Sequence, residues 1–377
     1  MSSTLETETS VLQREVEEIC KERIKSMKGK EWRLYKTNHE TFLLKGLGNL
    51  PPSFVALDAS KPWLVYWCIN SLALLDSTLI NDTMIHRVKS TIAACVSEDG
   101  GVGGGNGHLA HLAPTYAAIN ALSIVEPRKN LWPIDKEKLY NWLMSRKTSY
   151  GGFSMHVNGE VDTRALYCAL CVASLCDIIT PELTSGCAEW LSRCQGFDGG
   201  IAGSPGNEPH GGYTFCALAA LCILGEPRTM ISKYLDVDKL LYWLAARQYE
   251  IEGGFSGRTN KLVDGCYSFW VGGCFPLLQT ITEVPILSAY DLQKYIMTCS
   301  QVETGGLADK PGKRPDAYHT CYVLSGLSAS IGNYSFSNGS WNSSKKSEIY
   351  GGIEPIHPVY NIPMKCYKAL SIEAEVM

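Results

Sequence analysis

The feature that most constrains this chain is a repeat marked by pairs of adjacent glycines. The pairs recur at intervals of about 50 residues, at Gly100–Gly101, Gly151–Gly152, Gly199–Gly200, Gly253–Gly254 and Gly305–Gly306. Each interval holds a polar loop, a helix rich in small apolar residues, a linker, and an amphipathic helix that ends at the next pair. A repeated helix pair of this length is typical of a helical solenoid or a closed ring. Closure into a ring removes exposed apolar ends, so the sequence predicts an all-α fold, an α/α barrel of helix-pair repeats.

The two ends of the chain differ from the repeats. The first 55 residues are strongly charged and have helical patterns over residues 12–27 and 38–47. We therefore predict an N-terminal helical arm, residues 1–55, followed by a single α/α barrel domain, residues 56–377. The segment 328–346 is rich in Ser, Asn and Gly, and we predict that it is a surface loop.

Composition limits the class of protein. The formal net charge of −4 gives no indication of a basic patch, so neither nucleic acid nor an acidic membrane is an expected partner. No apolar run reaches the roughly 18 residues that span a bilayer. The 15 cysteines, many of them within apolar helical runs, predict buried free thiols rather than a disulfide framework. Together with the polar N-terminus, this favours a soluble protein of a reducing compartment, the cytoplasm.

Polar residues recur at the same distance after each glycine pair, near the start of each predicted inner helix. They are His111, Asp162, His210, Asp264 and Asp316. In a ring, the N-termini of the inner helices gather at one mouth, where their partial positive charges attract anions. Basic side chains near these positions, Arg164, Arg258 and Lys261, and the hydroxyl of Tyr267 strengthen this prediction. The set suits a diphosphate better than a carboxylate.

A candidate metal site lies at the same mouth. Asp264 and Cys266 are both possible Zn²⁺ ligands, but two ligands do not complete a site. His319, near the start of the next predicted inner helix, offers the third. Taken alone, the Asp-x-Cys pattern is also what a helix cap followed by a core thiol would give.

Aromatic residues gather just inside the predicted mouth. They are Trp63, Trp67, Tyr116, Tyr167, Tyr213, Trp270 and Tyr322. Any one of them could be ordinary core, but together they indicate a slot for a long apolar tail. An anionic head, an apolar tail and a zinc ion with one open position point to an isoprenyl diphosphate and a thiol nucleophile.

Several segments resemble the β subunits of protein farnesyltransferases, members of the protein prenyltransferase β family. These segments are Pro62-Trp-Leu-Val-Tyr-Trp67, His111-Leu-Ala-Pro-Thr-Tyr116, Gly159-Glu-Val-Asp-Thr-Arg164, His210-Gly-Gly-Tyr-Thr-Phe-Cys216, Asn260-Lys-Leu-Val-Asp-Gly-Cys266, Asp309-Lys-Pro-Gly-Lys313 and Tyr318-His-Thr-Cys-Tyr322. The likeness extends to His357-Pro-Val-Tyr-Asn361, which is most of the chain.

The resemblance implies a site and partners. It implies an α6–α6 barrel with one Zn²⁺ on Asp264, Cys266 and His319. It implies diphosphate contacts from His210, Arg258, Lys261 and Tyr267. It implies an isoprenoid slot lined by Trp63, Arg164, Tyr167, Tyr213, Cys216 and Trp270. It implies a peptide site near Trp63, Trp67, His111, Ala113, Pro114 and Tyr318. The implied substrates are farnesyl diphosphate and proteins with a C-terminal CaaX motif, such as small GTPases, and the implied partner is a helical-repeat α subunit in a heterodimer.

The length of the lipid is a separate question. Within the resemblance, Trp63 and Tyr116 favour the shorter farnesyl group, because geranylgeranyl members carry a smaller residue in place of Trp63. Asp309 agrees, since farnesyl members use an Asp there to bind Mg²⁺ on the diphosphate, whereas type I geranylgeranyl members carry a lysine. A type I geranylgeranyltransferase β subunit and a non-catalytic helical-repeat scaffold remain alternatives. A terpene cyclase does not, because the chain lacks its Asp-x-Asp-Asp acid.

Overall fold

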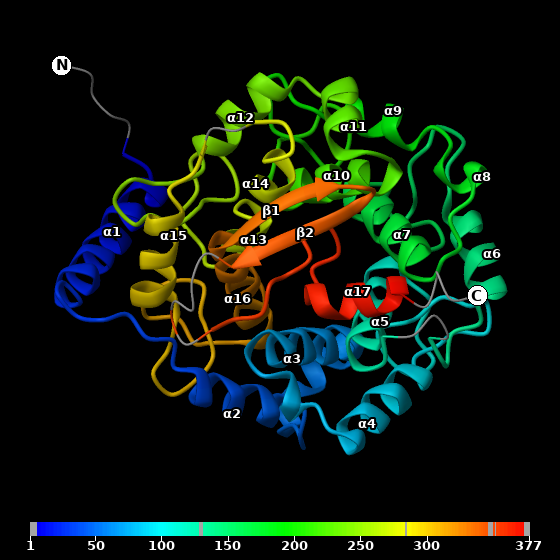
Figure 1. Cartoon of the computed structure of the whole chain (residues 1–377), viewed down its shortest axis with the longest axis horizontal. Helices are drawn as coiled ribbons and strands as arrows, with labels where there is room; N and C mark the ends of the chain where they lie inside the picture. Colours follow the sequence, from blue (N-terminus) through cyan, green and yellow to red (C-terminus); the bar gives the residue numbers. More distant parts are fainter. Residues whose placement is uncertain (1–5, 128–130, 283–284, 346–349, 351, 373–377) are drawn as a thin grey trace.

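Six helical units form the inner wall of a closed ring (Figure 1). The computed structural model describes residues 6–127, 131–282, 285–345, 350 and 352–372. The inner units are α3 (Lys61–Leu75), α5 (Leu112–Val125), α7 (Thr163–Leu175), α10 (Gly211–Leu224), α13 (Tyr267–Trp270) with α14 (Cys274–Leu278), and α16 (Ala317–Ile331). Each packs on the next, and α16 packs back on α3. The predicted α6–α6 barrel is therefore confirmed.

The composition of the inner helices explains why they can pack so closely. In α5, every residue except Ala113 is buried, and four of the buried residues, Ala117, Ala118, Ala121 and Ser123, have small side chains. The fifth inner unit departs from the expected continuous helix. It is broken between α13 and α14 at Gly272 and Gly273, where an added Cβ would come within 2.5 Å of the carbonyl oxygens of the preceding turn.

The outer layer consists of amphipathic helices. These are α2 (Lys36–Gly46), α4 (Asp82–Ala93), α6 (Lys136–Arg146), α8 (Pro181–Thr184) with α9 (Cys187–Ser192), α11 (Pro227–Tyr234) with α12 (Val237–Ala245), and α15 (Ala289–Tyr295), which continues into a π-helical turn, Ile296–Ser300. In α12, Leu240, Trp243 and Leu244 face inward and are buried, whereas Tyr242 is exposed.

The glycine pairs are needed where each loop passes under an outer helix. The first glycine of every pair has a positive φ, for example 100° at Gly199. A Cβ on the second glycine would lie 2.4 Å from the Trp243 ring at Gly200 and 2.6 Å from the Trp142 ring at Gly101. The repeat therefore reflects a backbone turn and an aromatic contact that only glycine permits.

The sixth outer position is taken by α2, from the N-terminal segment. A Cβ on Gly306 would lie 3.1 Å from the Phe42 ring, so Phe42 stands where Trp142 and Trp243 stand in other repeats. Helix α2 also packs on α3. The division at residue 55 stays a prediction about domains, but the contacts of α2 are those of a ring helix.

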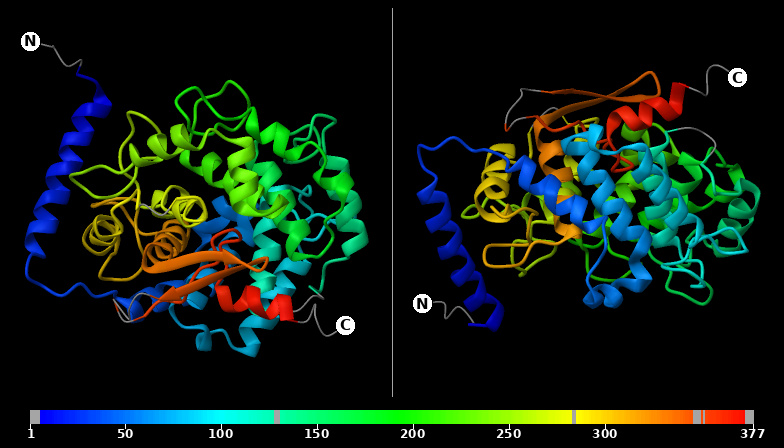
Figure 2. Two further views of the ribbon diagram at one scale, coloured as in Figure 1. Left: turned by 45° about the horizontal axis from the view of Figure 1, so that its top comes forward. Right: turned by 90° about the horizontal axis from the view of Figure 1, so that it is seen from below.

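Helix α1 (Glu8–Ser26) lies against the outside of the ring (Figure 2). Its buried residues Val16 and Cys20 form a small cluster with Val263, Tyr295 and Cys299. Gln13 donates a hydrogen bond of 2.9 Å to the buried carboxylate of Glu252. The arm-like helix is therefore docked on the ring at its middle.

The C-terminal part of the chain covers one end of the ring. Strands β1 (Gly332–Ser337) and β2 (Ser340–Lys345) form an antiparallel hairpin directly after α16, and α17 (Met364–Ile372) lies beside it (Figures 1 and 2). The hydroxyls of Tyr66 and Tyr167 donate to the backbone oxygens of Asn361 and Val359, at 2.6 and 2.7 Å. The segment before α17 therefore plugs the ring at the C-terminal ends of the inner helices.

The hairpin contradicts one prediction. Residues 328–331 end α16 and residues 332–345 form the two strands, so the prediction of a surface loop over 328–346 is wrong there; residue 346 lies outside the described residues. Tyr334 and Trp341, which alternate with polar residues, are 4% and 5% exposed and hold the hairpin on the ring. Among the described helices, none is both long and apolar enough to cross a bilayer.

Candidate active site

The five polar residues that follow the glycine pairs lie at the starts of inner helices, as predicted. His111, Asp162, His210 and Asp316 are the N-caps of α5, α7, α10 and α16. Asp264 accepts a hydrogen bond of 2.8 Å from the backbone N–H of Cys266, just before α13. These residues therefore satisfy free backbone N–H groups at the mouth opposite the C-terminal plug.

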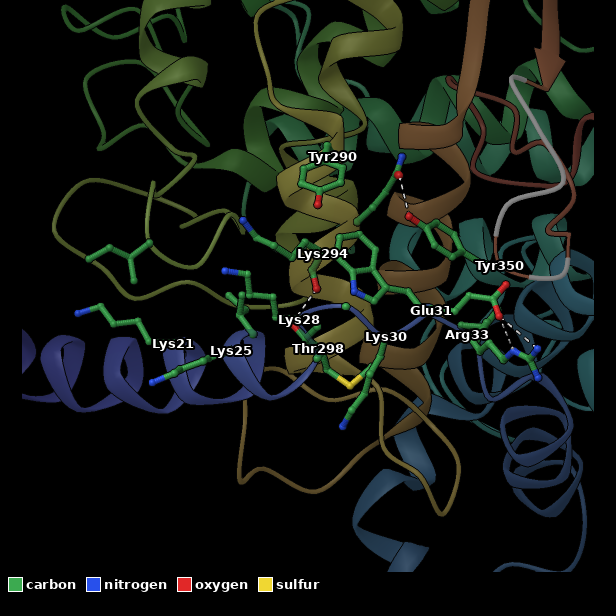
Figure 3. A pocket seen from close by; sticks show the side chains of 17 residues that line it. Lys21, Lys25, Lys28, Lys30, Glu31, Arg33, Tyr290, Lys294, Thr298 and Tyr350 are labelled. Carbon is green, nitrogen blue, oxygen red and sulfur yellow. Dashed lines mark hydrogen bonds and ion pairs between the residues drawn. The ribbon is translucent and has the colours of Figure 1, made fainter.

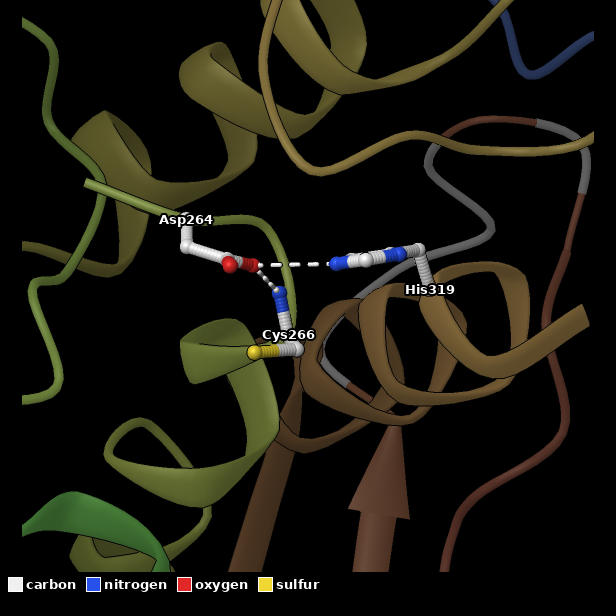
Figure 4. Close-up of side chains that lie close together, drawn as sticks. All are labelled: Asp264, Cys266 and His319. Atoms are coloured by element: carbon white, nitrogen blue, oxygen red, sulfur yellow. Dashed lines mark hydrogen bonds and ion pairs between the residues drawn. The ribbon is translucent and has the colours of Figure 1, made fainter. Parts of the chain in front are cut away.

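Asp264, Cys266 and His319 come together at this mouth (Figure 4). One carboxylate oxygen, the Cys266 sulfur and one imidazole nitrogen all lie within 4.8 Å of one another. His319 Nε2 lies 3.3 Å from Oδ1 of Asp264. The two segments, which belong to neighbouring repeats, meet because α13 packs on α16.

Asp316 orients the imidazole of His319. Its Oδ2 lies 2.7 Å from His319 Nδ1, while its Oδ1 accepts the backbone N–H of His319 at 2.7 Å. The hydrogen bond at Nδ1 leaves Nε2 facing Asp264, which is the arrangement that metal-binding histidines need. From the sequence, Asp316 was predicted only to lie near the start of an inner helix, although an Asp three residues before a candidate ligand histidine was visible there.

The electrostatics of the three side chains also fit a cation. Burial opposes protonation of His319, but hydrogen bonds to Asp264 and Asp316 outweigh it and raise its pKa to about 9. Burial alone would raise the pKa of Asp264, yet the hydrogen bonds from His319 and Cys266 lower it overall. Burial, and then the Asp264 charge, raise the pKa of the Cys266 thiol well above its usual range.

This donor set fits Zn²⁺. Oxygen, sulfur and imidazole nitrogen are the three ligand types of protein zinc sites, and ligands around a tetrahedral ion lie about 3.5 Å apart. The observed spacing requires only small side-chain movements to reach that geometry. A divalent cation would supply the positive charge that the partly buried Asp264 carboxylate and a Cys266 thiolate both need.

Replacing Asp316 with asparagine is expected to weaken metal binding by about tenfold, because the hydrogen bond to Nδ1 loses its negative partner. The asparagine side chain still caps α16, so the melting temperature should change little. Competition with a chelator would measure the metal affinity. Asp162→Asn, the same change at the cap of α7, is the control, and an equal loss in both variants would contradict this role for Asp316.

A cavity of about 600 Å³ adjoins the metal cluster. His210, Arg258, Lys261, Tyr267 and Asp309 all line it together with Asp264. The predicted diphosphate contacts therefore share one cavity, next to a candidate metal ligand. Its size and its cationic lining suit a small, highly charged anion.

Contacts within this cavity position the side chains. His210 Nε2 lies 2.9 Å from the Tyr267 hydroxyl, and His210 is also held by its cap bond to Gly212. Burial, and then the charge of Arg258, lower the pKa of His210, so it is neutral at pH 7. Arg258 pairs with Glu208, at the open side of the cavity.

Asp309 forms an ion pair with Lys310, a residue that was not among the predicted site residues. Its carboxylate pairs with the ammonium of Lys310, and both side chains are largely buried. Burial, and then the nearby Asp264 charge, raise the pKa of Asp309. A Mg²⁺ ion bound at Asp309 would therefore have to displace the Lys310 ammonium.

A closed circuit of aromatic contacts surrounds the barrel interior beside the cavity. Neighbouring ring centroids lie 4.4–5.8 Å apart around Trp63, Trp67, Tyr318, Tyr322, Trp270, Phe215, Tyr167 and Tyr116. Trp63, Trp67, Trp270 and Tyr318 are only partly buried, whereas Tyr116, Tyr167 and Tyr322 are fully buried beneath them. Seven of the eight were predicted; Phe215 was not.

The remaining predicted residues lie around this circuit. The ring of Tyr213 contacts the ring of His210. The guanidinium of Arg164 lies over the Tyr213 ring, 5.5 Å from its centroid, in a cation–π contact. Arg164 also pairs with the cap residue Asp162 at 2.5 Å and is not among the residues that line the cavity with Arg258. Cys216 is buried one turn further into α10. His111 packs against the ring of His156, 5.3 Å between centroids.

Helix α1 contributes residues that sequence reasoning missed. Leu12, Glu15, Val16 and Ile19 form one wall of the cavity. Their spacing marks one face of a helix, but nothing in the sequence indicates which part of the ring that face meets.

Comparison with known proteins agrees with the fold. Residues 34–362 match the family model of the prenyltransferase alpha-alpha toroid domain. A Saccharomyces cerevisiae protein named protein farnesyltransferase subunit beta is 42% identical over 96% of this chain and 85% of its own length. A Pyricularia oryzae protein of the same name is 41% identical over 87% of this chain and 71% of its own length.

Proteins named as geranylgeranyltransferases are less similar to this chain than the farnesyltransferase subunits are. An Arabidopsis thaliana geranylgeranyl transferase type-1 subunit beta is 34% identical over 58% of this chain and 58% of its own length. A solved structure titled Candida albicans protein geranylgeranyltransferase-I complexed with GGPP matches with a TM-score of 0.75 over 90% of this chain and 99% of that chain; at 23% identity it shows the fold alone. Because the toroid-domain model and the farnesyltransferase β subunits both match most of this chain, the chain belongs to the family of protein farnesyltransferase β subunits.

Proposed function

We propose that this chain is the catalytic β subunit of a protein farnesyltransferase. In this reaction the sulfur of a C-terminal CaaX cysteine forms a bond to C1 of farnesyl diphosphate, the C1–O bond breaks, and diphosphate leaves. The observation that carries the proposal is the Asp264–Cys266–His319 cluster, which borders both a cationic cavity and an aromatic-lined interior. The thiol and the diphosphate would bind at this mouth, and the isoprenoid would lie against the aromatic side chains beside it.

The metal cluster serves the thiol. Zn²⁺ bound there would lower the pKa of the substrate thiol from about 8.5, so that it is a thiolate at neutral pH. Two anionic protein ligands and one imidazole leave a fourth position for that sulfur. No side chain of this chain then has to remove the proton, which agrees with the absence of an unpaired carboxylate among the described residues of the cluster.

The cavity serves the leaving group. As the C1–O bond breaks, negative charge grows on the diphosphate, next to Arg258 and Lys261. The Tyr267 hydroxyl is fixed by its contact with His210 and can donate a hydrogen bond to the same oxygens. Groups held in place before the reaction stabilise developing charge without reorganising, and one such donor contributes about 10²-fold or more to the rate.

Two further components are proposed for the same site. Mg²⁺ would be held at Asp309 on the diphosphate, in competition with the Lys310 ammonium. A helical-repeat α subunit would complete the cavity and supply a lysine to the diphosphate, so this chain alone should be inactive. We also propose that the protein works in the cytoplasm, for which the 15 free cysteines, fourteen of them buried, are the support.

Farnesyl rather than geranylgeranyl transfer is favoured by Trp63. The centroid of its ring lies 5.5–6.2 Å from the ring centroids of Trp67, Tyr66 and Tyr116. The indole therefore takes up space inside the ring of aromatic side chains, next to α5. A geranylgeranyl group is five carbons longer and needs space where these rings lie. A non-catalytic scaffold would have no use for a metal cluster beside a cationic cavity.

One experiment tests the function. The chain is co-expressed with an α subunit, and single-turnover transfer to CaaX peptides is measured with both lipids, with and without Mg²⁺. We expect one zinc per heterodimer, faster transfer of farnesyl than of geranylgeranyl, and stimulation by Mg²⁺. Preference for geranylgeranyl would favour the type I alternative, and no transfer of either lipid by a zinc-loaded complex would reject the enzyme assignment.

A further inference from the structure

A second cavity, of about 1230 Å³, lies between α1, the linker that follows it, and α15 (Figure 3). It shares no lining residue with the cavity of the candidate active site. Its cationic lining consists of Lys21, Lys25, Lys28, Lys30, Arg33 and Lys294, and we call the cavity with these six residues the basic groove. Among the residues that the structure describes, Glu31 is the only carboxylate that lines it.

The basic groove is not evident from the overall charge. The net charge of −4 does not indicate a basic patch, and the prediction that there is none is wrong for this part of the surface. Three of the cations have acidic neighbours: Lys21 pairs with Glu18, Arg33 with Glu31 and Lys294 with Asp291. Within the described part of the chain, Lys25, Lys28 and Lys30 have no ion pair, and all three are exposed.

Local helix structure does not account for all of these charges. Lys25 lies in the last turn of α1, where a cation interacts favourably with the free carbonyl groups. Lys28 and Lys30 lie beyond the end of the helix, where this effect is small. Like charges this close repel one another, so an anionic partner would relieve the repulsion.

The arrangement of the cations favours an extended partner over a compact ion. Figure 3 shows Lys21 and Lys25 on one side of the basic groove and Arg33 on the other, so the charged groups do not converge on one point. An extended polypeptide rises about 3.3 Å per residue and could place successive carboxylates along such a row.

Two other extended partners fit less well. Single-stranded nucleic acid needs several exposed aromatic faces for base stacking, but among the rings that line the groove Trp32 contacts both Tyr290 and Tyr350, at 5.3 and 6.3 Å between ring centroids, and only Tyr290 is largely exposed. A membrane is locally flat, whereas these cations line a recess. We infer that the basic groove is a docking surface for an acidic segment of a partner polypeptide, separate from the candidate active site.

The test uses the full chain and a fluorescein-labelled peptide of about ten glutamates, long enough to span about 30 Å. Fluorescence anisotropy should detect binding at low salt that weakens steeply as ionic strength rises. The triple variant Lys25→Glu, Lys28→Glu, Lys30→Glu should bind the peptide at least about tenfold more weakly, because three attractive charges become repulsive.

The matched control reverses three exposed lysines outside the basic groove, Lys45→Glu, Lys138→Glu and Lys233→Glu, which changes the net charge equally. It should bind the peptide within about twofold of the unchanged chain. Equal losses in both variants, or no peptide binding at all, would overturn the proposal. So would tighter binding of a single-stranded RNA or of phosphatidylserine vesicles that the first variant, but not the control, abolishes. Circular dichroism would establish that both variants fold.

Discussion

Replacing Cys266 with alanine is expected to release the bound metal and to slow farnesyl transfer by about 10³-fold or more. The substitution removes one of two anionic ligands, and the two that remain, Asp264 and His319, cannot complete a zinc site. Metal content per heterodimer and single-turnover rates with saturating lipid would measure both effects.

The fold should survive this change. Cys266 is 4% exposed, and removing one sulfur atom from the start of α13 leaves a small cavity worth about 1 kcal/mol. Cys176→Ala, at an equally buried thiol at the end of α7, is the matched control and should keep both metal and activity. If Cys266→Ala keeps full zinc stoichiometry and turnover, the ligand assignment is wrong.

Replacing Trp63 with threonine is expected to shift the preference between the two lipids by about 100-fold towards geranylgeranyl diphosphate. The indole is partly buried between Trp67 and Tyr116, so its loss opens space within the aromatic circuit for a longer chain. The measurement is the ratio of kcat/KM values for the two lipids with one peptide.

The variant Trp63→Phe is the control, because it keeps an aromatic side chain at this position. Phenylalanine keeps an aromatic ring in contact with Trp67 and Tyr116, so this variant should retain most of the preference for farnesyl. An unchanged lipid ratio in Trp63→Thr, with zinc content and melting temperature unaltered, would exclude Trp63 as the residue that limits lipid length.

The sequence predicted the ring well because its repeat has a steric cause. The second glycine of each pair lies under an aromatic residue of an outer helix, so glycine recurs wherever the loop and the helix meet. The same reasoning predicted which residues start the inner helices, and therefore which polar groups share the mouth. The pairing of Asp316 with His319 was also within reach, since both residues lie in one helical turn.

Other features depended on contacts that no local pattern encodes. Phe42 fills an aromatic position of the ring from a segment that follows a different pattern, so α2 could not be assigned to the outer layer from spacing. The basic groove gathers residues 21–33 and Lys294, whose proximity only the docking of α1 reveals. The hairpin is different, because its signal was in the sequence. Asn338 and Gly339 both have positive φ, and an Asn-Gly pair between alternating apolar residues is a strong indication of a two-residue turn.

The position of α2 has a consequence for how the chain folds. An open solenoid can be lengthened or shortened by whole repeats, and each repeat is stabilised by its nearest neighbours. Here, the fifth glycine loop is covered by a helix that leaves the ribosome more than 250 residues earlier. The first and last segments of the ring therefore stabilise each other, and a growing chain keeps an unsatisfied seam until α16 has been made. Trimming the chain at either end should destabilise the whole ring cooperatively rather than remove one unit.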